Sequence, residues 1–220
     1  MSSIPNHLLI KAINHEPIDR TPIWVMRQAG RYLPEYIKLK NKAGGFINLI
    51  KNPELACEIT MQPLNRFSLD SAIVFSDILV IADMIGINLS FVENKGPVFD
   101  KTITTQSDLE SLQVLDDITK LNYVFQTIKL IKKELNNKKP LIGFIGSPWT
   151  VATYVIEGNS SKTFKNVLHL LKNDVSLMHN ILDMLTNISI KYLNKQIESG
   201  IDVAMIFDTW GSLLSDNDYE

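Results

Sequence analysis

The chain contains a single cysteine, Cys57, among its 220 residues. One cysteine cannot form an internal disulfide, and zinc sites built from several cysteines are excluded. No apolar run approaches the ~18–20 residues that a membrane-spanning helix needs. The first 20 residues lack the basic start and long apolar stretch of a secretory signal peptide. We therefore expect a cytoplasmic protein with no membrane partner.

Neither sign of charge is in large excess, because the net charge is only −2. This balance argues against a nucleic-acid partner bound through a broad basic face. Of the 22 basic residues only four are arginine, which leaves 18 lysines, and two of these arginines are Arg27 and Arg31. A guanidinium grips carboxylates bidentately, which an ammonium cannot do. The pair therefore favours an anionic ligand, with two surface ion pairs as the alternative.

Hydrophobic residues make up 45% of the chain and charged residues 21%, which is typical of a globular protein. We expect a single domain over residues 1–220. Apolar runs predict strands at 22–26, 71–75, 140–145 and 202–207, and helical patterns predict helices at 53–66, 119–135, 162–172 and 173–199. Because the strands are almost continuously apolar, we expect a parallel sheet covered on both faces, and hence an α/β fold.

A polar or glycine-containing loop follows each predicted strand. The loops are 27–32, 76–77, 146–150 and 208–211. In parallel α/β folds the loops at the carboxyl ends of the strands form the ligand site. No Gly-x-Gly-x-x-Gly segment follows the first strand and no Walker phosphate loop occurs, so nucleotide binding through a glycine-rich loop is not supported.

The segment from Trp24 to Tyr36, WVMRQAGRYLPEY, resembles the signature near the N-terminus of the uroporphyrinogen decarboxylase family. Three later blocks resemble the family in the same order: Phe75–Leu79, Gly146–Gly158 and Phe207–Gly211. The resemblance implies a (β/α)₈ TIM barrel that works as a homodimer with neither a metal nor an organic cofactor. It also implies an enzyme of haem biosynthesis that removes the four acetate carboxyls of uroporphyrinogen III to give coproporphyrinogen III.

The chain departs from the family pattern in two ways. Ser212 stands where the family usually has a second glycine. Four predicted strands fall short of the eight that close a barrel, and none of the histidines lies in a motif block to match the family's later cleft histidine. We therefore expect about the first half of the barrel, the N-terminal portion of such an enzyme. Whether the 220-residue chain is itself active stays open.

The resemblance implies roles for eight residues. Asp77 would be the counter-charge for a cationic substrate ring, and Arg27 and Arg31 would bind carboxylates and take part in catalysis. The proposed substrate-binding residues are Arg27, Gln28, Ala29, Gly30, Arg31, Asp77, Tyr154 and Thr209. Structural alternatives are a helix cap for Asp77, a core position for Tyr154, a positive-φ turn for Gly30 and loop hydrogen bonds for Asp208.

Two other functions remain possible from the sequence. A corrinoid-linked methyltransferase of the same superfamily would share the broad fold, but would carry zinc on His and Cys ligands in its later half. Alternatively, the 220-residue chain is a truncated, inactive fragment of the decarboxylase. An isolated half barrel exposes sheet edges and an uncovered core face, which promotes association.

Overall fold

The structure is a computed structural model that describes residues 7–92, 95–112 and 118–219. The beginning of the segment examined for a signal peptide, residues 1–6, lies outside this range. Two compact units make up the chain. The first unit comprises Met1–Ser76, Asn122–Phe144 and Lys195–Met205, and the second comprises Asp77–Leu121, Ile145–Asn194 and Ile206–Glu220.

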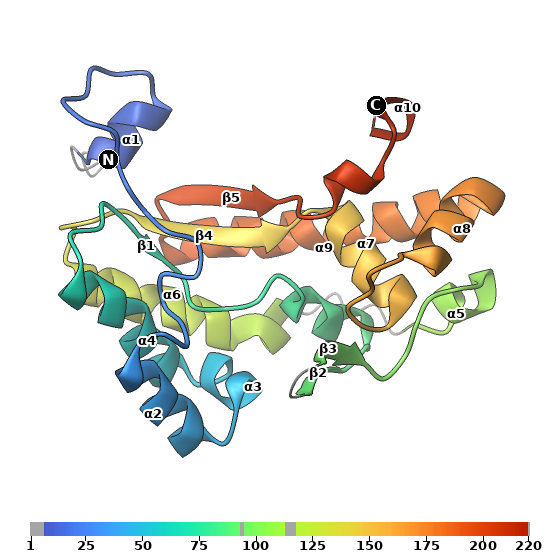
Figure 1. Cartoon of the computed structure of the whole chain (residues 1–220), viewed down its shortest axis with the longest axis horizontal. Helices are drawn as coiled ribbons and strands as arrows, with labels where there is room; N and C mark the ends of the chain where they lie inside the picture. Colours follow the sequence, from blue (N-terminus) through green and yellow to red (C-terminus); the bar gives the residue numbers. More distant parts are fainter. Residues whose placement is uncertain (1–6, 93–94, 113–117, 220) are drawn as a thin grey trace. The chain divides into compact units, whose positions relative to one another are not determined.

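Three of the four predicted strands are present. They are β1 (Ala72–Ile73), β4 (Leu141–Gly146) and β5 (Val203–Phe207), in the order β1-β4-β5 (Figure 1). β1 pairs with β4 in parallel, with Ala72 opposite Leu141 and Ile73 opposite Ile142. The predicted α/β fold with parallel strand pairing is confirmed. β5 alternates between half-buried and exposed side chains, so the prediction that every strand is covered on both faces is wrong for β5.

The predicted strand at residues 22–26 is absent, and that prediction is wrong. The exposed fractions of Ile23, Val25 and Met26 are 55%, 52% and 61%. A continuously apolar strand is stabilised when both of its faces are covered. These side chains are not covered, so the segment forms an extended loop instead of joining the sheet.

Helices α4 and α6 pack side by side in the first unit (Figure 1). α4 (Pro53–Arg66) has the predicted bounds, and the Asn52 side chain caps it by accepting a 2.9 Å hydrogen bond from the Leu55 N–H. α6 (Asn122–Leu135) follows the short 3₁₀ helix η2 (Ile118–Leu121), so the predicted helix at 119–135 is confirmed with a tighter first turn. Its buried stripe contains Val124, Phe125, Ile128, Ile131 and Leu135.

Three short helices of the first unit were not predicted. They are α1 (Leu8–Ile13), α2 (Pro34–Ala43) and α3 (Phe46–Ile50). Side chains from α2, α3 and α4 form a core cluster with Leu33, Tyr36, Leu49 and Ile59. Cys57 on α4 is buried, and burial raises the pKa of its thiol to about 11, so it is an inert core residue.

The second unit contains most of the unpredicted structure. Its elements are η1 (Val80–Ile85), the antiparallel pair β2 (Leu89–Val92) and β3 (Gly96–Phe99), α5 (Gln106–Glu110), α7 (Pro148–Glu157), α8 (Lys165–Asn173), η3 (Gly211–Leu213) and α10 (Asp216–Tyr219). α7 replaces the loop that was expected after the third predicted strand. Two successive helices were predicted at 162–172 and 173–199, and α8 and α9 confirm them.

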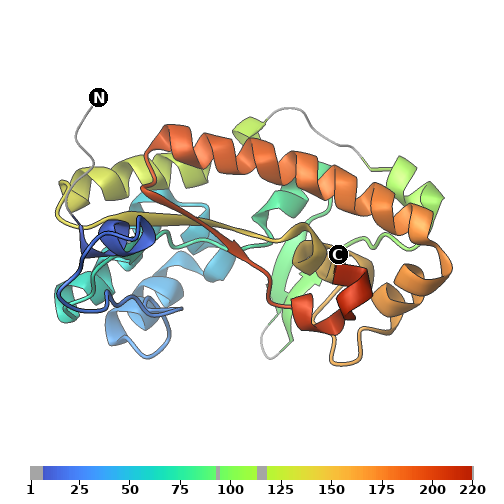
Figure 2. The same ribbon diagram turned by 90° about the horizontal axis from the view of Figure 1, so that it is seen from above.

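Helix α9 (Val175–Ser199) is one continuous helix (Figure 2). It begins in the second unit and ends in the first. Gly200 follows with φ of 112°, a left-handed conformation that glycine adopts without the steric cost of a Cβ atom. Within residues 7–92, 95–112 and 118–219, none of the helices combines the length and apolar character needed to cross a bilayer.

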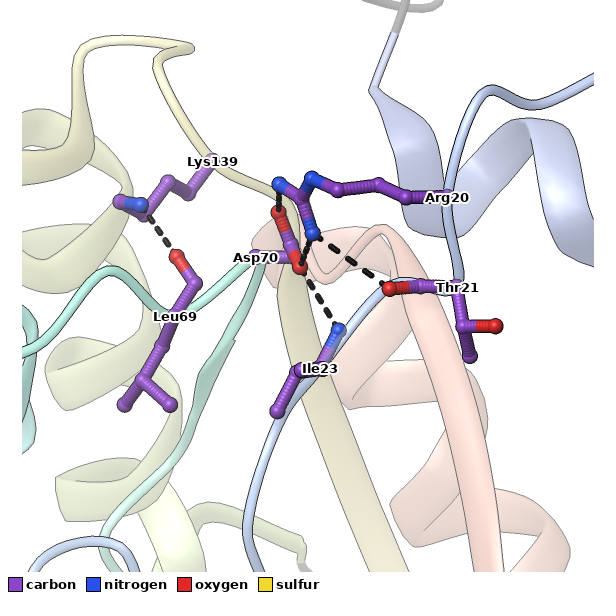
Figure 3. A network of polar contacts seen from close by, with 6 residues as sticks. All are labelled: Arg20, Thr21, Ile23, Leu69, Asp70 and Lys139. Atoms are coloured by element: carbon purple, nitrogen blue, oxygen red, sulfur yellow. Dashed lines mark hydrogen bonds and ion pairs between the residues drawn. The ribbon is translucent and has the colours of Figure 1, made fainter.

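An ion pair anchors the chain shortly before the segment that contains Arg27 and Arg31 (Figure 3). The Arg20 guanidinium donates from Nη1 to Oδ2 of Asp70 over 2.7 Å and from Nη2 to Oδ1 over 2.6 Å. The Asp70 carboxylate also accepts the Ile23 N–H over 2.7 Å, and the Asp70 N–H donates to the Ile23 carbonyl over 2.8 Å. Residues 20–23 are thus tied to the residue that precedes the β1 region.

We expect Asp70→Ala to lower the free energy of unfolding by about 1 kcal/mol at pH 7, because the exposed Arg20 keeps the pair well screened. The hydrogen bond from Arg20 is the main cause that lowers the pKa of Asp70, and the Ile23 N–H adds to it. The stabilisation is therefore present above the unfolded pKa of ~3.9 and disappears as the pH falls through the folded value.

Chemical denaturation of the wild type and of Asp70→Ala across pH 3–7 checks this prediction. Glu198→Ala is the control, because it removes a carboxylate from an ion pair with Lys195 in which both side chains are exposed. The control is expected to change stability by less than ~0.5 kcal/mol. Equal effects of the two substitutions at pH 7 would contradict the anchoring role.

Candidate active site

The loop between Arg27 and Arg31 lies in the first unit, and both arginine side chains are exposed. Arg27 has φ of 60°. Such a left-handed conformation costs a non-glycine residue ~1–2 kcal/mol and is concentrated at functional sites. The chain therefore holds the exposed Arg27 in a strained backbone conformation.

The four arginines fall into two groups. Arg20 pairs with Asp70, and Arg66 pairs with Glu35 over 2.6 Å from Nε to Oε1. Neither Arg27 nor Arg31 forms an ion pair within residues 7–92, 95–112 and 118–219. The alternative of two surface ion pairs is therefore wrong for Arg27 and Arg31 among the described residues, and both guanidinium groups are available to another acceptor.

Gln28 is buried, with 3% of its surface exposed, and it fixes the loop between the two arginines. Its Nε2 donates to the Ser71 carbonyl over 3.2 Å, and its Oε1 accepts the Val25 N–H over 3.2 Å. The Gln28 carbonyl accepts the Tyr32 hydroxyl over 2.6 Å. The structure gives the Gln28 side chain a positioning role toward β1.

Ala29 and Gly30 complete the turn. Ala29 packs against the core cluster of Leu33 and Tyr36. Gly30 does not have a positive φ, so that reason for a glycine is wrong. A Cβ atom at Gly30 would lie 3.2 Å from the Arg27 carbonyl oxygen, and this close approach is the local reason for a small residue.

Arg31 also acts on the core below the loop. Burial raises the pKa of the Tyr36 hydroxyl, and the positive charge of Arg31 opposes that rise. The two groups are therefore close enough to interact electrostatically, although Tyr36 is buried and Arg31 is exposed. The loop thus carries its charge at the surface, directly above an aromatic core.

Asp77 lies in the second unit and is half-buried. Its Oδ1 accepts the Leu79 N–H over 2.8 Å, just before η1. This bond closes the turn before η1, whose N-cap is Leu79 without a side-chain capping bond, so the predicted helix cap by Asp77 is not formed. The adjoining Ile78 lies close to Gly146, because a Cβ atom on Gly146 would be 3.2 Å from the Ile78 Cβ. Asp77 is thus next to the junction between β4 and α7.

Tyr154 is half-buried on α7 and faces the block after β5. Its ring centroid is 6.4 Å from that of Trp210, whose ring also contacts Phe164 at 4.7 Å. Thr209, the residue before Trp210, is exposed. The second unit therefore places Tyr154 on α7 against Trp210, the residue that follows Thr209.

Ser147, Thr150 and Asp208 form a polar cluster that the sequence reasoning did not identify. The Ser147 and Thr150 hydroxyls both donate to Asp208 Oδ1, over 2.5 Å and 3.0 Å. Ser147 is also the N-cap of α7 and precedes Pro148 at the first helical position. A serine followed by proline is a known helix-start signal and predicts this cap from the sequence. Asp208 was expected to bond loop N–H groups, but its side chain accepts the Ser147 and Thr150 hydroxyls instead.

No group of three or more His, Cys, Asp and Glu side chains suited to a metal ion occurs among the residues that the structure describes. The first unit presents the exposed Arg27 and Arg31, whose guanidinium groups can bind carboxylates. The second unit presents the half-buried carboxylate of Asp77, which can stabilise a cation.

Comparisons with known proteins agree with the motif blocks. The family model described as uroporphyrinogen decarboxylase (URO-D) matches residues 4–220. A uroporphyrinogen decarboxylase of Ruthia magnifica subsp. Calyptogena magnifica is 55% identical over 211 residues, which are 96% of this chain and 61% of that protein. Another, of Hydrogenovibrio crunogenus, is 49% identical over 100% of this chain and 62% of its own length. The chain thus spans about three fifths of these relatives.

A methyltransferase from Methanosarcina mazei superposes with a TM-score of 0.77 at 23% identity, covering 96% of this chain and 61% of that structure. At this identity the likeness concerns the fold alone, and it confirms the TIM-barrel type with about the first half of the barrel. The family assignment has a separate basis. The family model spans residues 4–220, and the two relatives are 55% and 49% identical to this chain in the aligned region. On these grounds the chain belongs to the uroporphyrinogen decarboxylase family.

Proposed function

We propose that the full-length protein removes the four acetate carboxyls of uroporphyrinogen III, giving coproporphyrinogen III in haem biosynthesis. One observation carries the proposal toward a polycarboxylate. Arg20 and Arg66 are used in ion pairs, whereas Arg27 and Arg31 stand exposed in a strained loop without an ion-pair partner among the described residues. Guanidinium forks held this way suit carboxylate side chains.

The substrate supplies its own electron sink, so the reaction requires neither a metal nor an organic cofactor. Protonation of a pyrrole α-carbon makes a cationic ring. The C–C bond to the acetate carboxyl then breaks, CO₂ leaves, and its electron pair neutralises the ring. A second proton adds to the exocyclic carbon to give a methyl group, and the α-carbon loses the first proton.

In this proposal Asp77 stabilises the positive charge that develops on the ring. A carboxylate accepts hydrogen bonds only, so it suits the inward-turned pyrrole N–H groups. Charge stabilisation of this kind is usually the largest catalytic contribution. Tyr154 and Thr209 would offer hydroxyl groups to substrate carboxylates, and the backbone of Gln28, Ala29 and Gly30 would complete the carboxylate site beside the arginines.

Arg27 and Arg31 also support the proton step as positioning groups. A free guanidinium is effectively always protonated and is a poor acid. Delivery by a water or by a substrate carboxyl that an arginine holds is compatible with the same site. The rest of the proposal is a cytoplasmic homodimer with residues 1–220 in a single domain and no nucleic-acid or membrane partner.

An anaerobic assay of the full-length protein with uroporphyrinogen III tests the proposal. We expect CO₂ release and coproporphyrinogen as the final product, unchanged by a chelator. A corrinoid-linked methyltransferase would instead transfer a methyl group from a methylcorrinoid and lose activity when zinc is removed. Methyl transfer without CO₂ release would overturn the decarboxylase proposal in favour of that alternative.

A further inference from the structure

Thr209 lies between Asp208 and Trp210, and both of these neighbours are hydrogen-bonded to residues at the start of α7. On one side, Asp208 Oδ1 accepts the hydroxyls of Ser147 and Thr150. On the other, the Trp210 N–H donates to Thr150 Oγ1 over 3.3 Å, and the Trp210 carbonyl accepts Nε1 of Trp149 over 2.8 Å. The peptide groups around Thr209 are therefore held between two anchored neighbours.

Thr150 is the centre of this arrangement. Its side chain is fully buried, and its hydroxyl both donates to Asp208 and accepts from the Trp210 N–H. The backbone of the two segments is also joined, since the Ser147 N–H donates to the Phe207 carbonyl over 2.9 Å. The Thr150 hydroxyl thus contributes two of the hydrogen bonds that link the start of α7 to the loop after β5.

Gly211 is required by the same arrangement. A Cβ atom at this position would lie 2.6 Å from Asp208 Oδ2 and 3.1 Å from its Cγ. Contacts under 3.0 Å force a displacement, and the displaced group would be the carboxylate that holds Ser147 and Thr150. The glycine of the Phe207–Gly211 block is thus explained by the space that the Asp208 carboxylate occupies.

We propose that Ser147, Thr150 and Asp208 form a clamp that positions Thr209 for substrate binding, with Thr150 as its central positioning residue. The inference rests on the proposed function, in which Thr209 meets a substrate carboxylate. Asp208 contributes through Oδ1, which accepts the two hydroxyl donors of the clamp.

Thr150→Val tests the clamp in the full-length protein, because valine keeps the shape and removes the hydroxyl. Hydrogen exchange of the segment 208–211 is expected to rise about tenfold. The KM for uroporphyrinogen III is expected to rise about tenfold or more, with a smaller change in kcat, since an ill-placed binding group loses uniform binding. Thr150→Ser restores the hydroxyl and is expected to return both quantities to near wild-type values.

Thr153→Val is the matched control. Thr153 is equally buried on α7, and its hydroxyl donates to the Thr150 carbonyl and not to Asp208. It is expected to leave exchange at 208–211 and KM unchanged. The clamp is overturned if Thr150→Val leaves exchange or KM unchanged, or if Thr153→Val raises them equally. If the wild type releases no CO₂, the proposed function fails, and equal exchange in the two valine variants then overturns the clamp.

Discussion

Asp77→Asn in the full-length protein is expected to lower kcat for CO₂ release by ~10³-fold, the scale for losing one well-placed electrostatic group. Asparagine has the same size, and its side-chain oxygen can still accept the Leu79 N–H that Asp77 Oδ1 accepts over 2.8 Å. The substitution therefore keeps the turn before η1 and removes the negative charge. The role of Asp77 in the turn before η1 is thereby separated from its electrostatic role.

Asp100→Asn is the control for Asp77→Asn. Asp100 lies in the same unit, outside the motif blocks, and its Oδ1 accepts the Asn88 N–H over 2.8 Å. Hydrogen bonds from Asn88 lower the pKa of Asp100, so it too carries a negative charge at neutral pH. Single-turnover rates of the two variants measure the loss of catalysis, and their thermal midpoints show whether either substitution destabilises the fold. Near wild-type turnover by Asp77→Asn would refute a catalytic role for this carboxylate.

Arg27→Lys is expected to raise the KM for uroporphyrinogen III by ~10- to 100-fold, the cost of about one to two charge-assisted hydrogen bonds. Lysine retains the positive charge and loses the planar fork. Steady-state kinetics at two salt concentrations measure the effect. A purely electrostatic attraction would be kept by lysine and would weaken with salt, whereas the loss of bidentate binding persists at both concentrations.

Two further variants separate the chemistry of Arg27 from its conformation. Arg27→Gly removes the guanidinium but suits the φ of 60°, so it is expected to raise KM without lowering stability. Arg66→Lys removes a guanidinium from the pair with Glu35 in the same unit, so it is expected to leave KM unchanged. A wild-type KM for Arg27→Gly, or equal KM values for Arg27→Lys and Arg66→Lys, would exclude carboxylate binding by Arg27.

Local patterns in the sequence determined four of the described α-helices, which are α4, α6, α8 and α9. The Asn52 cap and Pro53 place the start of α4. The apolar residues of α6 recur at three- and four-residue intervals, which a helix places on one face. The same reasoning missed α7, although Ser147 and Pro148 announce its start. Signals of this kind extend over a few residues, so they can be read without knowing what packs nearby.

The strand prediction at 22–26 failed because strand formation depends on residues that are distant in the sequence. A continuous apolar run describes what a segment would gain from burial, but burial depends on neighbours that are distant in the sequence. Ile23, Val25 and Met26 have no covering layer and stay exposed. The sequence of the segment is therefore compatible with a strand, and the surrounding chain decides whether a strand forms.

The sequence by itself determined the family, the alternation of strands and helices, and the unusual placement of Arg27 and Arg31. Only the tertiary structure decided that Arg20 and Arg66 are used in ion pairs and that Thr150 joins Asp208 and Trp210 across 58 and 60 positions. Hydrogen bonds of that separation form when folding brings two strand ends to one edge, and no local pattern specifies which donor meets which acceptor.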